Sequence, residues 1–130
     1  RGFAEVTAKD ALAMGLMQAL SIFPGISRSG STIAGGLLSG LDRRASARFS
    51  FLMAIPIMLA AGLLAALDLA EVPNISAMLS VIAAGFLSAA VVGYLAIRWL
   101  LAFLQKHSLI AFAIYCVCAG GLVLVVSLLR

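Results

Sequence analysis

The ten residues FPGISRSGST, from Phe23 to Thr32, interrupt a chain that is otherwise almost entirely apolar. They bring together one arginine, four hydroxyl side chains, two glycines and a proline. Pro24 followed by Gly25 is a strong break signal, because proline lacks the N–H that continues a helix and glycine adopts turn conformations at little cost. The stretch therefore predicts a polar turn between two helices.

The composition places this turn in a membrane protein. The 130 residues are 64% hydrophobic and 11% charged, with a mean hydropathy of +1.18, whereas soluble domains are about 45–50% apolar. We expect an all-α integral membrane protein with a single domain over residues 1–130. The net charge of +4 does not indicate nucleic-acid binding, because the basic residues mark the ends of apolar segments. Since the chain starts with Arg1 and has no secretory leader, we expect a fragment of a longer protein.

The segments beside the turn are short for membrane helices. TAKD, from Thr7 to Asp10, predicts a helix start with Thr7 as the N-cap. The apolar run from Ala11 to Phe23 then reaches only about 20 Å, against about 30 Å of hydrocarbon. A second short helix, from about Ser31 to Ser39, follows the turn and ends at Gly40. We therefore expect a re-entrant hairpin over residues 11–40, in which Gly36 and Gly40 form a close packing face.

Three longer apolar segments follow, and each is long enough to cross a bilayer. They cover residues 47–69, 75–103 and 109–129. The basic residues outside the turn fall mainly on one side of the membrane in this arrangement. The loop over residues 68–74, on the other side, carries two acids and no Lys or Arg. The side with the basic residues is therefore expected to be cytoplasmic. A hairpin made of two complete spans would give the same charge distribution, so helix length is what favours the re-entrant form.

The polar turn has the donors of an anion site. Arg28 adds a fixed positive charge beside the N-terminus of the second short helix, whose first N–H groups have no intrahelical partner. Hydroxyl donors come from Ser27, Ser29, Ser31 and Thr32, and Gly25 and Gly30 allow close backbone approach. Phosphate matches these donors better than a carboxylate or halide. Taken singly, Arg28 could reach the interface and Ser29, Ser31 or Thr32 could act as an N-cap, but together at membrane depth they favour a site.

PGISRSGST, followed by RFSFLMAIPIM and later by FAIYC, resembles the second half of the undecaprenyl-diphosphate phosphatases, the BacA-type family linked to bacitracin resistance. The resemblance covers essentially the whole chain. It implies two inverted repeats, each a re-entrant hairpin with three spanning helices, of which this chain is the second. The implied activity is hydrolysis of undecaprenyl diphosphate to undecaprenyl phosphate and inorganic phosphate in the bacterial plasma membrane, which recycles the lipid carrier for cell-wall synthesis.

The resemblance also implies roles for individual residues. By matching positions, the diphosphate is bound by Ser27, Arg28, Ser29, Gly30 and Thr32, with Arg28 and Ser27 as the candidate catalytic residues. A divalent cation, Mg²⁺ or Ca²⁺, is implied, with ligands from a Glu-Gly-x-x-Glu-type segment and a nearby histidine in the first repeat. Nothing in this chain matches that segment, so no metal ligand is predicted here.

Other functions and partners remain open at this point. Half of a lipid-phosphate flippase or transporter would also be built from an inverted repeat with broken helices. A third hypothesis is that the chain is an inactive fragment. The expected partners are a polyprenyl diphosphate lipid, the bilayer and the first repeat, and a homodimer is compatible with the sequence.

Overall fold

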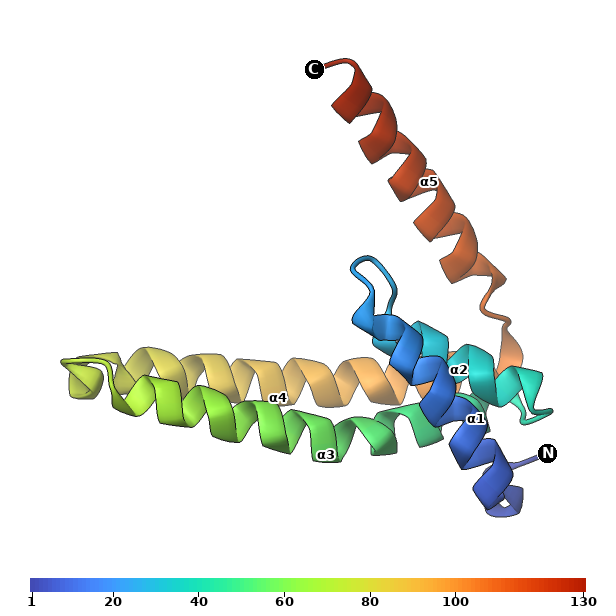
Figure 1. Ribbon diagram of the computed structural model, residues 1–130, viewed down its shortest axis with the longest axis horizontal. Helices are drawn as coiled ribbons and strands as arrows, with labels where there is room; N and C mark the ends of the chain where they lie inside the picture. Colours follow the sequence, from blue (N-terminus) through green and yellow to red (C-terminus); the bar gives the residue numbers. More distant parts are fainter.

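The computed structural model describes residues 1–130 and is entirely helical (Figure 1). Five α-helices and two short 3-10 segments follow one another: η1 (Phe3–Glu5), α1 (Ala8–Ala19), η2 (Leu20–Ile22), α2 (Arg28–Leu38), α3 (Arg43–Ala70), α4 (Ile75–Lys106) and α5 (Ile110–Leu128). Helices α3, α4 and α5 are each long and apolar enough to cross a membrane. The all-α class and the three long helices predicted from the sequence are confirmed.

Helices α1 and α2 form a short antiparallel hairpin. Helix α1 begins where the sequence predicts, because the Thr7 hydroxyl accepts a hydrogen bond from the Asp10 amide at 3.3 Å and the Asp10 carboxylate accepts one from the Thr7 amide at 2.8 Å. It ends at Ala19, and one 3-10 turn carries the chain to Ile22. The turn reverses at Gly25, whose φ of +91° is a conformation that glycine adopts without strain. The polar turn between two helices is therefore present.

The N-cap of α2 differs from the positions considered in the sequence. The helix begins at Arg28, and Ser27 is the N-cap because its Oγ accepts a hydrogen bond from the Gly30 amide at 3.1 Å. This places the whole SRSGST segment at the start of the helix. Ser29 and Ser31 therefore lie inside the helix rather than capping it.

The two glycines expected to form one packing face have different roles. A Cβ on Gly36 would lie 2.5 Å from the Ser46 Oγ, so α2 and α3 can approach this closely only because Gly36 has no side chain. Gly40 has no neighbour at its Cβ position and instead has a φ of +90°. It closes α2 through the bonds Gly40 N to Leu37 O and Leu41 N to Gly36 O, both 3.0 Å. The expectation that Gly40 belongs to the packing face is therefore wrong.

The buried core lies where the hairpin crosses the start of α3 and the end of α4 (Figure 1). Met14, Leu41 and Ala45 form one cluster, and a second cluster is formed by Ile33, Ala47 and Leu104. We call this region the junction. Beyond it, α3 and α4 run side by side as an antiparallel pair, and α5 extends away from the end of α4 (Figure 1). No residue of α5 is buried.

An ion pair closes the base of the hairpin. Arg1 donates to the Asp10 carboxylate through two nitrogens, at 2.9 and 2.7 Å, and to the Ser39 carbonyl at 2.6 Å. The Arg1 guanidinium, together with the Thr7 amide and hydroxyl, holds the pKa of Asp10 well below its usual range. Because Asp10 is on α1 and Ser39 follows α2, Arg1 connects the outer ends of both helices.

Candidate phosphate-binding site

The motif predicted to bind phosphate occupies the turn and the first helical turn of α2. Ser27 is exposed, while the Arg28 and Ser29 side chains are half-buried. The Ser27 and Ser29 hydroxyl oxygens are 3.4 Å apart. Because Ser27 Oγ and Ser27 O accept from the amides of Gly30 and Ser31, the amides of Arg28 and Ser29 are the ones left without a partner at this helix start. The helix therefore starts with two free N–H groups, those of the arginine itself and of the serine that follows it.

Thr32 takes a different position from the other motif residues. Its side chain is fully buried, and its hydroxyl donates to the Arg28 carbonyl at 2.7 Å. Thr32 lines neither of the two cavities beside the motif. In this structure it supports the first turn of α2, and its direct contact with phosphate stays a prediction.

Two open cavities lie on different sides of the motif. The first, of about 390 Å³, is lined by Arg28 together with Gln18, Ser21 and neighbouring apolar residues. The second, of about 380 Å³, has Ser27, Ser29 and Gly30 at one edge. The rest of its lining is mainly apolar and comes from α2, α4, α5 and the residue before α5: Ile33, Leu100, Leu109, Phe112, Ala113 and Cys116. We call the first the polar cavity and the second the apolar groove.

Gln18 is a residue of this region that the motif did not indicate. It lies on α1, opposite the start of α2, and its Oε1 is 3.5 Å from both the Arg28 guanidinium and the Thr32 hydroxyl. The signal in the sequence was a lone amide inside the apolar run from Ala11 to Phe23. A polar side chain there needs a partner, and only the packing of α1 on α2 identifies it.

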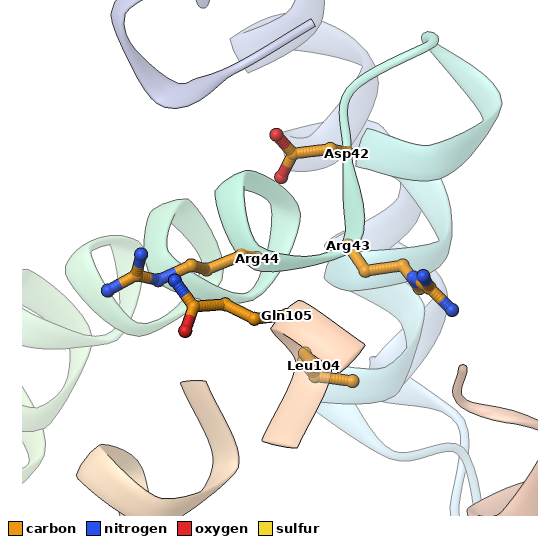
Figure 2. A pocket seen from close by; sticks show the side chains of 5 residues that line it. All are labelled: Asp42, Arg43, Arg44, Leu104 and Gln105. Carbon is orange, nitrogen blue, oxygen red and sulfur yellow. The ribbon is translucent and has the colours of Figure 1, made fainter. Parts of the chain in front are cut away.

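A third cavity, of about 410 Å³, is lined by Asp42, Arg43, Arg44, Leu104 and Gln105 (Figure 2). In Figure 2 the guanidinium groups of Arg43 and Arg44 point in different directions, so they do not converge on one ligand. The Asp42 carboxylate accepts from the Ala45 amide at 2.7 Å and caps α3. The Arg28 region is therefore the better candidate for binding a compact anion.

Comparison with known proteins identifies the family. The family described as "Bacitracin resistance protein BacA" matches residues 1–122. The chain belongs to the BacA family. The match confirms the resemblance that the motif indicated. The matched residues include the motif, the junction and most of α5.

Relatives within this family share close to half of the residues. An undecaprenyl-diphosphatase of Methanosphaera stadtmanae is 45% identical over 123 residues, which cover 95% of this chain and 44% of the relative. One from Corynebacterium striatum is 47% identical over 127 residues, with 95% and 44% covered. One from Thermomicrobium roseum is 45% identical over 131 residues, with 100% and 47% covered. The chain thus spans less than half the length of these relatives.

Proposed function

We propose that the protein containing this chain hydrolyses undecaprenyl diphosphate to undecaprenyl phosphate and inorganic phosphate, and that this chain supplies the phosphate-binding half of the site. The names of the BacA-family relatives support the reaction. The observation that carries the assignment to this chain is the start of α2, which bears the Arg28 side chain and leaves the backbone amides of Arg28 and Ser29 without a partner. A helix N-terminus and an arginine together favour a multiply charged phosphate.

Arg28 has the main chemical role in this proposal. Its guanidinium donates to oxygens of the diphosphate and stabilises the charge that develops when the bond to the terminal phosphate breaks. Ser27 and Ser29 offer hydroxyl donors at the edge of the same turn, and Gly30 keeps that edge open. Ser27 is also the candidate catalytic residue beside Arg28, although its oxygen already accepts from the Gly30 amide.

The apolar groove accounts for the other part of the substrate. A polyprenyl chain is entirely hydrocarbon, and the groove offers side chains of α2, α4 and α5 next to the Ser27–Gly30 edge. A substrate bound there keeps its diphosphate at the motif while its isoprenoid units remain out of water. The adjacency of the groove and the motif supports a lipid substrate over a soluble phosphate ester.

The same proposal assigns a membrane arrangement. The 12 residues of α1 extend about 18 Å and the 11 of α2 about 17 Å, while the 28 of α3 extend about 42 Å. We assign α1 and α2 to a re-entrant hairpin and residues 1–130 to one of two inverted repeats in a multi-pass protein of the bacterial plasma membrane. The other repeat and the bilayer cover the exposed apolar helices, and a homodimer is compatible with the remaining surface.

The divalent cation implied by the resemblance does not find its ligands among these residues. No group of three or more His, Cys, Asp or Glu side chains gathers anywhere in the chain. Glu5 is exposed at the base of the hairpin, and Glu71 lies at the far end of α3. We therefore assign the cation to ligands outside this chain and derive no step through it.

The proposal is tested in the full-length protein, reconstituted in lipid nanodiscs with undecaprenyl diphosphate as substrate. Arg28→Ala is expected to lower kcat/KM for phosphate release by about 10²–10³-fold, because it removes a charged donor from the transition state. Arg44→Ala is the matched control, since it removes an arginine from the cavity of Figure 2. Undiminished turnover with Arg28→Ala contradicts the assignment. Lipid translocation without phosphate release would indicate the flippase instead.

A further inference from the structure

Gln18 faces the motif from the opposite helix of the hairpin. Its Oε1 lies 3.5 Å from an Arg28 guanidinium nitrogen and 3.5 Å from the Thr32 Oγ1, at the outer limit of hydrogen-bond distance. Both Gln18 and Arg28 line the polar cavity. The amide is therefore close to the guanidinium without being tightly bonded to it.

The chemistry of Arg28 fixes which end of the amide faces it. A guanidinium only donates, so the atom nearest to it has to be the carbonyl oxygen Oε1. The Thr32 hydroxyl proton is already directed to the Arg28 carbonyl at 2.7 Å and does not compete for this orientation. The Nε2 group of Gln18 makes no hydrogen bond to any other residue of the chain. Two N–H donors on the wall of the polar cavity thus remain unused.

We infer that Gln18 is a second phosphate-binding residue, which orients Arg28 through Oε1 and donates from Nε2 to an oxygen of the diphosphate. This inference rests on the proposed function and deepens it by adding a ligand from α1. The phosphate would then be held from both helices of the hairpin. The role differs from simple capping or packing because it requires an acceptor and a donor on the same side chain.

A neutral amide is suited to this position. A carboxylate in place of the amide would also orient Arg28, but it would pair with the guanidinium and repel the phosphate. An aliphatic side chain would leave Arg28 without an orienting acceptor. Glutamine supplies the acceptor while leaving the full positive charge of Arg28 available to the substrate.

The test uses full-length protein in nanodiscs and farnesyl diphosphate as a short polyprenyl diphosphate. Gln18→Leu is expected to lower kcat/KM by about 10- to 100-fold, which corresponds to losing hydrogen bonds to charged groups. Gln105→Leu makes the same substitution at the chain's other glutamine, in the cavity of Figure 2, and is expected to leave kcat/KM within about twofold. Equal effects of the two substitutions would overturn the inference.

A second variant gives a readout that a purely structural role would not change. Gln18→Glu keeps an acceptor for Arg28 but loses the donor while its carboxyl is ionised. Because the Arg28 guanidinium favours the ionised form of this carboxyl, Gln18→Glu is expected to stay less active than wild type at every pH from about 8 to about 5. Arg28 is the only titratable residue lining this cavity, so no other side chain there alters the charge of the introduced carboxyl. Wild-type activity in Gln18→Glu at pH 8 would overturn the donor role.

The same measurements separate this inference from the proposed function. Wild-type protein that releases no phosphate, or an Arg28→Ala variant as active as wild type, contradicts the proposed function itself. Normal wild-type activity, a defective Arg28→Ala and an unaffected Gln18→Leu contradict only the role of Gln18.

Discussion

The junction and the outer helices of this chain are built from similar apolar residues, but they are packed very differently. At the junction, Met14 is completely buried and Gly36 lies against Ser46 with no room for a methyl group. In α5, Val123 is 66% exposed and Gly120 has no neighbour at its Cβ position. The junction holds the two helices that carry the candidate site, although Thr32 is the only motif residue that is itself buried. The chain therefore holds the helices of the candidate phosphate-binding hairpin by its own contacts, whereas α5 makes no buried contact within this chain.

Removing a large side chain from each region of the full-length protein is expected to reveal this difference in packing most strongly. Met14→Ala is expected to lower the free energy of unfolding by about 2–5 kcal/mol, since it empties a fully buried position beside Leu41 and Ala45. Val123→Ala is the matched control and is expected to cost under about 1 kcal/mol in a lipid environment. Denaturant titration in mixed micelles measures both. Equal losses would mean that α5 is packed as tightly as the junction in the whole protein.

Adding a methyl group to a glycine in each region is expected to have a smaller effect. Gly36→Ala is expected to cost about 1–3 kcal/mol, because its Cβ would lie 2.5 Å from the Ser46 Oγ. Gly120→Ala has open space and is expected to cause no loss.

Replacing Ser46 by glycine in the Gly36→Ala background removes the clashing side chain, and it should recover part of the stability. The same unfolding titration gives the result. No recovery in the double variant would mean that something other than this contact requires Gly36.

The ion pair between Arg1 and Asp10, at the base of the hairpin, is expected to contribute least to the free energy of unfolding at neutral pH. The folded pKa of Asp10 is lowered by Arg1 and Thr7, so its contribution to stability is present above the unfolded pKa of about 4 and is lost as the pH falls below that value. Solvent screening reduces this contribution, because the Arg1 side chain is 39% exposed. Thermal unfolding at pH 6 and pH 3 should show a smaller acid-induced loss in Asp10→Asn than in wild type. An identical pH dependence in the two proteins would exclude a stabilising role for this pair.

Much of the hairpin could be predicted because its signals are local. Thr7 and Asp10 mark the start of α1 within four residues, and Pro24 with Gly25 ends the first helix whatever the rest of the chain does. The N-cap of α2 was harder to predict. Four hydroxyl residues within six positions could each accept from a nearby amide, and the backbone geometry at Ser27 selects one of them.

The amino-acid sequence alone predicts a helical chain that is apolar enough for a membrane, with one polar turn that carries an arginine. Composition, helix length and break signals are local properties, so they can be read without the fold. Which residues lie against that arginine depends on how the helices pack. Gln18 lies ten positions before Arg28, and Leu100 and Phe112 of the apolar groove lie more than seventy positions after it. Contacts over such separations depend on how closely the helices approach. At the junction, that approach is set by a glycine facing a serine.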